Sequence, residues 1–266
     1  MGSDDWVSAE IDIGKPSSAR VYDYFLGGAH NFEVDRQVAE QVLAMYPDAR
    51  LMAQSNRAFL RRVVRFLVGE GVRQFIDIGS GIPTVGHVHE VAQDTAPDAR
   101  VVYVDIDPVA VAHSEFILAG NIQATVVQED ARSPERIYAH AEVRRLLDLR
   151  RPVAVLALAV FHFIADEDDP ARIMAALTDP LVAGSYVAIS HVTRDGFDED
   201  AQDPFQGSGV DVTPRTRAEV EALMCGLELV DPGVVWVPRW RPTSPDDVQY
   251  DEPEASGAYA AVGRKP

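Results

Sequence analysis

A short apolar run followed by two closely spaced glycines occurs at Phe75-Ile76-Asp77-Ile78-Gly79-Ser80-Gly81-Ile82-Pro83. Glycine adopts positive φ angles without strain and lets a ligand approach the backbone where a Cβ would block it. A helix that follows such a turn also offers free N–H groups to an anion or a carboxylate. A Gly-x-Gly turn alone is a weak signal, because strand-to-helix turns also use glycine for geometry alone. The segment predicts a strand, a tight turn and a polar ligand near that turn.

Similar apolar runs recur along the chain, separated by segments with helical spacing. The expected strands are 75–78, 101–104, 124–127, 153–160 and 186–189, and then shorter ones at 227–230, 234–237 and 258–262. Asp107-Pro108, Asp169-Pro170 and Thr213-Pro214 each predict the start of a helix, since Asp and Thr cap helices and Pro fits the first turn. Strands that alternate with helices indicate a mostly parallel α/β sheet with helices on both faces. Ligands bind such sheets beyond the carboxyl ends of the strands.

The first 70 residues lack this strand pattern and have helical spacing instead. Apolar residues predict one helix over 33–45 and a second through 59–67. An aromatic-rich segment at 16–28 precedes both and is expected to pack on the main body. We expect residues 1–70 to form a helical cover or lid, and residues 71–266 to form a Rossmann-like domain, in one compact unit.

Composition limits the class of protein and its partners. The chain has 266 residues, of which 47% are hydrophobic and 25% charged, as in ordinary globular proteins. A net charge of −18 repels phosphate backbones and anionic lipids, so we expect neither nucleic acid nor a membrane as a partner. Cys225 is the single cysteine, so no internal disulfide forms, and we find no secretory leader and no long apolar span. The expected location is the cytoplasm.

Two features resemble metal sites, and we expect neither to be one. His87 and His89 are two positions apart and would not share a helix face. The acidic run at 195–203 lies within residues 193–213, which are long for a connection and predict a mobile insert or lid. Carboxylates in such segments normally face water, so the sequence predicts no metal.

Acidic residues follow the second and third expected strands. Asp105 lies 24 positions beyond Gly81, near the offset of about 20 at which an acid binds ribose hydroxyls. Asp107 has the alternative role of a helix cap before Pro108. Glu129-Asp130-Ala131 follow the third strand, where a carboxylate could accept the amino group of adenine. Together with the Gly-x-Gly turn, these residues suggest an adenosyl ligand.

A nicotinamide dinucleotide is the competing adenosyl ligand. Its fingerprint has a third glycine where this chain has Thr84, so the cradle for the pyrophosphate is incomplete. Asp77 would repel a pyrophosphate but would attract the ammonium group of a methionine moiety. The charges therefore favour S-adenosylmethionine. An oxidoreductase is the weaker alternative, and a regulator that binds S-adenosylmethionine without turnover stays open.

Several segments resemble known methyltransferases. The segments 76–81, 104–105, 129–131 and 158–163 together resemble the class I S-adenosylmethionine-dependent methyltransferase pattern. More narrowly, the chain resembles an actinobacterial S-adenosyl methyltransferase family, first catalogued as a domain of unknown function, at 17–28, Asn31-Phe32, Asn56-Arg57, 226–233 and Trp240-Arg241-Pro242. The resemblance implies a seven-stranded, mostly parallel Rossmann-like sheet with an N-terminal cover. It implies S-adenosylmethionine as the cofactor and leaves the methyl acceptor, which we expect to be a small molecule, unidentified.

The candidate site combines these strand ends with the N-terminal segment. The residues expected to contact the cofactor are Asp77, Gly79, Ser80, Gly81, Asp105, Ile106, Asp107, Glu129, Asp130, Ala131, Ala159, Phe161, Arg20, Asn31 and Phe32. Phe161 or Phe163 could flank the adenine or the acceptor, although aromatic residues beside a central strand are usually core. Arg20 could bind a carboxylate as the segment closes over the cofactor, and a structural strap is the alternative. The lid hypothesis predicts that Arg20→Ala weakens cofactor binding but leaves the melting of the apoprotein nearly unchanged.

Methyl transfer depends mainly on aligning the acceptor with the S–CH₃ bond and on excluding water. A base is needed only if the acceptor must lose a proton. His162 and His191, which follow the fourth and fifth strands, are the candidate catalytic bases. Each could instead be a hydrogen-bonded structural histidine.

Overall fold

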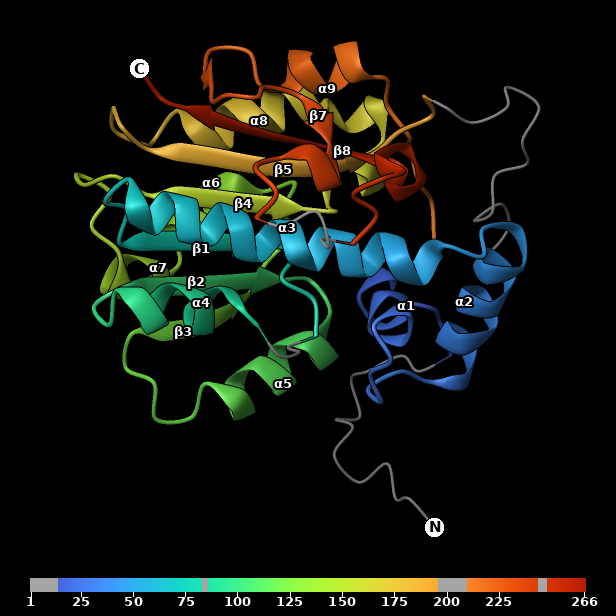
Figure 1. The fold of residues 1–266 in the computed structure, drawn as a ribbon. Helices are drawn as coiled ribbons and strands as arrows, with labels where there is room; N and C mark the ends of the chain where they lie inside the picture. Colours follow the sequence, from blue (N-terminus) through green and yellow to red (C-terminus); the bar gives the residue numbers. More distant parts are fainter. Residues whose placement is uncertain (1–13, 83–85, 196–209, 244–247) are drawn as a thin grey trace.

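An eight-stranded sheet forms the centre of the protein in the computed structural model, which describes residues 14–82, 86–195, 210–243 and 248–266 (Figure 1). The strand order is β3-β2-β1-β4-β5-β8-β6, and β7 also pairs with β8. The strands are β1 (Gln74–Ile78), β2 (Arg100–Asp105), β3 (Ala124–Gln128), β4 (Ala154–Leu158), β5 (Tyr186–Val192), β6 (Glu228–Leu229), β7 (Val235–Trp236) and β8 (Ala258–Arg264). The first five run parallel, whereas β8 is antiparallel to its partners. The predicted α/β class is confirmed.

The structure has the eight strands that the sequence predicts, one more than the resemblance implies, because two short strands divide the last position of the sheet. One edge of β8 pairs with β5 along its whole length, so β6 and β7 share the other edge. Between them the chain turns, and the N–H of Gly233 donates to the carbonyl of Val230. The sheet therefore has the seven positions that the resemblance implies.

The fourth strand is shorter than the sequence predicts. It ends at Leu158, two residues before the predicted end, because Ala159 has a φ of 58° and a 3₁₀ turn follows at Phe161–Phe163. A single residue in the left-handed region turns the chain out of the strand direction. This turn carries His162 and Phe163 to the edge of the sheet where ligands are expected.

Helices cover both faces of the sheet. The long helices are α1 (Ser18–Phe25), α2 (Glu33–Met45), α3 (Ala49–Gly69), α4 (Val88–Thr95), α5 (Pro108–Ile117), α8 (Pro170–Thr178) and α9 (Arg217–Leu223), with the short α6 (Pro134–Ala139) and α7 (Ala141–Leu146). Neighbouring strand residues alternate between two cores, since Phe75 packs with α3 and α4 whereas Ile76 packs with α6 to α9. This alternation is the two-residue period of a β-strand.

The N-terminal helices are joined to the sheet by α3. Its first turns pack with α1 and α2 around Val21, Val38 and Ala53, and its later turns pack on the sheet. In Figure 1, α3 runs across the near face of the sheet, with α1 and α2 beside its first half. The sequence predicts this helix only from residue 59, ten residues after its start at Ala49. None of the helices in the described ranges is long and apolar enough to span a membrane.

The region after β5 also differs from the sequence prediction. Helix α9 begins at Arg217 rather than after Thr213-Pro214, with Thr216 as its cap. The N–H of Thr213 donates to the carbonyl of His162, so this segment is held against the 3₁₀ turn that follows β4. Most of the predicted insert at 193–213, including the acidic run after Asp195, lies outside the described residues.

Candidate functional site

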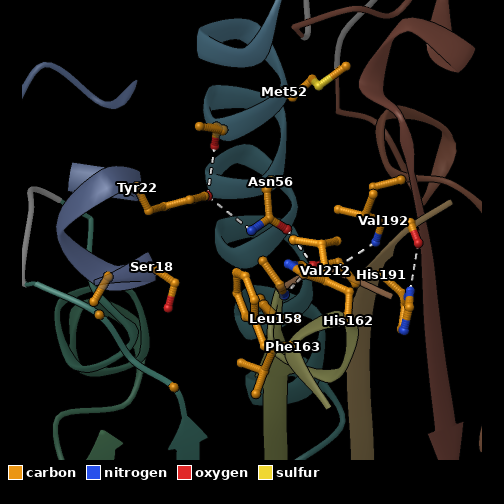
Figure 2. Close-up of a pocket in the computed structure, with 18 of the residues that line it drawn as sticks. Ser18, Tyr22, Met52, Asn56, Leu158, His162, Phe163, His191, Val192 and Val212 are labelled. Carbon is orange, nitrogen blue, oxygen red and sulfur yellow. Dashed lines mark hydrogen bonds between the residues drawn. The ribbon is translucent and has the colours of Figure 1, made fainter. Parts of the chain in front are cut away.

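A cavity of about 1020 Å³ lies at the carboxyl ends of β1 to β5, between the sheet and the N-terminal helices (Figure 2). Small-molecule pockets typically measure about 300–1,000 Å³, so this one has room for two ligands side by side. The predicted site residues that line it are Asp77, Gly79, Ser80, Gly81, Asp105, Ile106, Glu129, Asp130, Ala131, Ala159, His162 and His191. The predicted residues outside its lining are Arg20, Asn31, Phe32, Asp107 and Phe161.

The glycines after β1 are required for different reasons. A Cβ on Gly79 would lie 2.5 Å from Cγ2 of Val160, so only glycine fits against that side chain. Gly81 has a φ of +67°, and a Cβ there would meet nothing within 4 Å. The N–H of Gly81 donates to Oδ2 of Asp105 at 2.7 Å. The turn therefore joins the ends of β1 and β2 and leaves open space beside Gly81.

Asp105 occupies the centre of the strand-end group. Its Oδ1 accepts from the N–H of Asp107 at 2.8 Å, so both carboxylate oxygens have backbone donors. Burial raises the pKa of Asp105 to about 6, although these N–H donors lower it in part. The side chain of Ile106 is 59% exposed at the cavity, which offers an apolar surface to a flat ring.

Two carboxylates follow β3 at the same edge. Asp130 pairs with Arg132 at 2.7 Å, and Glu129 pairs with Arg136 at 3.1 Å. Both carboxylates line the cavity. The arginine partners hold both side chains in place at the cavity wall, where a carboxylate oxygen can accept from an amino group.

Asp77 and Arg57 form the most polar part of the cavity. No hydrogen bond from a described residue reaches the Asp77 carboxylate, and burial raises its pKa to about 7, against the lowering effect of Arg57. Arg57, only 8% exposed, lies 5.8 Å from the ring of Tyr22, and its Nε is buried without a partner. No ion pair joins its guanidinium to another residue in the described part of the chain. A buried cation and a buried acid in one cavity, neither with a hydrogen bond or an ion pair to a described residue, indicate a zwitterionic ligand.

Arg57 lies in one of the segments that resemble the family, and the sequence predicts no role for it. A signal for it exists in α3, where Ala53, Leu60 and Val64 are buried at helical spacing and Arg57 falls on the same stripe. Arginine is almost never buried without a partner, so a charge on this apolar stripe indicates a binding role.

The contacts of Arg20 favour the structural strap, which the sequence left open beside the lid. Its guanidinium donates to Asp35 at 2.9 Å and to Asp107 at 3.3 Å, and it lies 5.3 Å from the ring of Phe32. Arg20 and both acids are buried. The carboxylates that Arg20 binds therefore belong to the protein, which favours the structural strap over the lid, and on this geometry we expect Arg20→Ala to lower the melting temperature of the apoprotein.

The remaining predicted residues outside the lining have structural contacts. Asn31 donates to Asp23 at 2.8 Å, and Phe32 packs against Ile82 and Val109. Asp107 caps α5 by accepting from the N–H of Val109, the alternative that the sequence left open. Phe161 is fully buried in the sheet core, whereas Phe163 is 39% exposed and lines the cavity.

The candidate bases differ in the freedom of their ring nitrogens. His191 Nδ1 donates to the carbonyl of Val192 at 2.7 Å, and its Nε2 accepts from Arg215 at 3.0 Å. Burial lowers the pKa of His191 to about 4. These contacts favour a structural role for His191. His162 Nδ1 accepts from the N–H of Val192 at 3.4 Å, and burial lowers its pKa well below the usual range.

A hydrogen-bonded chain crosses the cavity wall and links three elements that the sequence could not place together. Ser190 donates to Asn56 at 2.6 Å, and Asn56 donates to the hydroxyl of Tyr22 at 3.0 Å. The Tyr22 hydroxyl in turn donates to the carbonyl of Ala53, as Figure 2 shows. The chain fixes α1 and α3 against the end of β5, so the N-terminal helices hold a defined position over the cavity.

Comparisons with known proteins agree with this geometry. A family model described as S-adenosyl methyltransferase matches residues 4–266. A putative methyltransferase from Thermobifida fusca YX is 39% identical, with a TM-score of 0.91 and 98% of each chain covered. A DUF574 family protein from Streptomyces avermitilis MA-4680 is 37% identical, also with a TM-score of 0.91, and covers 97% of this chain and 100% of its own. No protein with a curated description matches the chain.

A more distant structure supports the fold alone. The plantazolicin methyltransferase BpumL, solved in complex with SAH, is 12% identical, with a TM-score of 0.50 over 93% of this chain and 95% of its own. The match of the family model and of the two closer structures extends over nearly the whole chain. These matches favour a methyltransferase over the oxidoreductase alternative. The chain belongs to the S-adenosyl methyltransferase family.

Proposed function

We propose that this methyltransferase binds S-adenosylmethionine in the polar part of the cavity and methylates a small molecule in the apolar part. The observation that carries the proposal is one cavity that the glycine turn, Asp105 and Glu129-Asp130 line together with Arg57 and Asp77. A net charge of −18 disfavours nucleic acid as the acceptor. A small-molecule acceptor fits the volume of the cavity.

The nucleoside would lie across the ends of β1 to β3. Asp105 would accept hydrogen bonds from the ribose hydroxyls, since a buried carboxylate has acceptor capacity beyond its two backbone donors. Ile106 would pack against the adenine ring, and Glu129 or Asp130 would accept from its amino group. The open space beside Gly81 would admit the ribose or the sulfonium region close to the backbone.

The methionine moiety would satisfy the two partnerless charges. Asp77 would pair with its ammonium group and Arg57 with its carboxylate, which is the bidentate geometry that guanidinium favours. The bound cofactor supplies an activated methyl group on a sulfonium. The protein's own task is to orient the acceptor and to exclude water, and we propose that α1 and α2 are the cover that does so.

Turnover separates an enzyme from a binder that does not react. The protein is incubated with S-adenosylmethionine and an extract of the native cells, and S-adenosylhomocysteine is quantified over time. We expect product with extract and none with buffer alone. Binding of S-adenosylmethionine without product in any extract fraction would instead indicate the regulatory alternative.

Asp77→Asn is expected to stabilise the apoprotein at pH 8 and to weaken cofactor binding. The folded pKa of Asp77, about 7, lies above its ordinary value, so the folded state holds a proton that the unfolded state has lost. The stability contributed by this proton is therefore present at low pH and is lost as pH rises through 7. The isosteric amide removes this loss, and a gain of about 2 kcal/mol would raise the melting temperature at pH 8 by roughly 5 °C.

Melting curves at pH 4.5 and pH 8 check this effect, with the exposed Asp94→Asn as the matched control. The advantage of Asp77→Asn should be small at pH 4.5 and large at pH 8. Wild-type affinity for S-adenosylmethionine should also rise from pH 6 to 7.5 as Asp77 ionises, and the rise should be smaller in the variant. An Asp77→Asn protein that melts below wild type at pH 8 would contradict this account.

A further inference from the structure

Part of the cavity has an apolar wall, which we name the acceptor lobe. It is lined by Tyr22, Val42, Tyr46, Met52, Val192 and Val212, which come from the N-terminal helices, the end of β5 and the segment before α9. Figure 2 draws Tyr22, Met52, Val192 and Val212 among the residues that line the cavity. Such a wall favours a ligand with an apolar, ring-like body.

Polar side chains beside the acceptor lobe are already paired within the protein. Arg194 pairs with Glu219 at 2.6 Å, and Asp195 accepts from the hydroxyl of Tyr259 at 3.1 Å. The Tyr22 hydroxyl both donates and accepts in its chain with Asn56. Arg57 would pair with the carboxylate of the cofactor, so it would not be available to the acceptor. A phosphorylated or otherwise highly charged acceptor would therefore find no partner among the described residues of the lobe.

His162 is the exception, because one of its ring nitrogens stays available to a ligand. Its Nδ1 accepts from the N–H of Val192, so the proton of the neutral ring is on Nε2. The residue as a whole is only 4% exposed. No described residue forms a hydrogen bond with Nε2, and Nε2 is not one of the fully buried atoms that lack a partner. The Nε2–H group therefore reaches the cavity surface, beside the rings of Phe163 and His191.

Resting on the proposed function, we propose that the methyl acceptor is an apolar aromatic molecule with a phenol-type hydroxyl whose oxygen accepts a hydrogen bond from His162 Nε2–H. An N–H donor stabilises an ionised oxygen in an apolar site, whereas a neutral amine has no negative charge to stabilise and a single lone pair, which a hydrogen bond would withdraw from the attack on the methyl group. His162 is thus a donor to the nucleophile and not the base that the sequence suggested. Burial lowers its pKa far enough to keep it neutral.

The methyl transfer needs no side chain of the protein to take up the proton of the phenol. The phenol loses its proton to water before the reaction, and the phenolate then attacks the methyl carbon. The O–CH₃ bond forms as the S–CH₃ bond breaks, and the electron pair of that bond returns to sulfur. The products are a methyl ether and S-adenosylhomocysteine, and the charges of the phenolate and the sulfonium are both neutralised.

Matched pairs of aromatic probes test the acceptor class. Methyl-labelled S-adenosylmethionine is incubated with 7-hydroxycoumarin or 7-aminocoumarin, and with 2-naphthol or 2-naphthylamine, and labelled products are separated. We expect label in the hydroxyl member of each pair and none in the amine. Label in the amines, or in none of the four probes, overturns the assignment. Calorimetric binding of S-adenosylmethionine is measured in parallel, so that failure of the cofactor site is recognised separately.

Two substitutions of one residue test the donor. His162→Gln keeps an N–H near the position of Nε2, whereas His162→Leu removes it. We expect kcat to fall about 100-fold in His162→Leu and no more than about fivefold in His162→Gln, while both bind S-adenosylmethionine as wild type does. Equal losses of kcat in the two variants would indicate a base and overturn the proposal.

A spectroscopic measurement gives a readout that does not depend on turnover. Ionised 7-hydroxycoumarin absorbs at longer wavelength than the neutral phenol, so the bound anion can be titrated in the presence of S-adenosylhomocysteine. Wild type and His162→Gln should bind a larger anionic fraction than free solution holds at the same pH, and His162→Leu should not. An anionic fraction that is the same in all three proteins contradicts the hydrogen bond, even where a variant folds poorly enough to lower its activity.

Discussion

Arg57→Met is expected to weaken the binding of S-adenosylmethionine by about 2–4 kcal/mol, or roughly 30- to 1,000-fold. Arg57 is buried, lines the cavity and has no ion-pair partner in the described residues, so the bound carboxylate would be its principal one. Methionine keeps much of the aliphatic length and removes only the charge and its donors. The apoprotein should not lose stability, because a buried cation without a partner is itself unfavourable.

Calorimetry with two ligands isolates the carboxylate contact. Decarboxylated S-adenosylmethionine should bind wild type and Arg57→Met with similar affinity. The two proteins and the two ligands form a double-mutant cycle, which assigns the loss of affinity for S-adenosylmethionine to the contact between Arg57 and the carboxylate. Arg65→Met is the matched control, since Arg65 is exposed on the same helix. Equal losses for both ligands would show that Arg57 only supports the cavity wall, for example through Tyr22.

Arg20→Ala is expected to destabilise the protein by about 3–5 kcal/mol, which corresponds to a fall in melting temperature of roughly 10 °C. The change leaves Asp35 and Asp107 buried without their common cation. It also releases the contact between the N-terminal helices and the cap of α5. Thermal melting of the apoprotein measures the effect.

Arg145→Ala provides the control for a salt bridge that faces solvent. Arg145 pairs with Glu142 on the surface of α7, where such a pair contributes no more than about 1 kcal/mol. Arg20→Ala should therefore melt well below Arg145→Ala. Equal melting temperatures would mean that the Arg20 network is not held in solution, and would restore the lid interpretation of Arg20.

The strand ends could be predicted because their information is local. Each apolar run ends in a polar residue or a glycine, and parallel strands bring all these ends to one edge. Asp77, Asp105 and Glu129-Asp130 meet at one cavity for that reason, although they lie up to 53 positions apart. The caps of α5 and α8 at Asp107 and Asp169 were also predictable, since a cap and its donor are two or three residues apart.

The residues that sequence reasoning placed differently depend on long-range pairing. Arg20 meets Asp107 across 87 positions, and His191 meets Arg215 across 24, so no local pattern indicates either partner. Arg57 requires the path of α3 over the sheet, which depends on how α1 and α2 pack. The choice between Phe161 and Phe163 depended on the φ of Ala159, where the strand ends early.

The most direct test of the adenosyl site is a calorimetric titration of wild type and Asp105→Ala with S-adenosylmethionine. We predict one site per chain in wild type, and an affinity at least 30-fold lower in Asp105→Ala, because the ribose hydroxyls lose a buried charged acceptor. Circular dichroism confirms that the variant is folded. No heat with wild type, or the same affinity in the two proteins, would contradict the account.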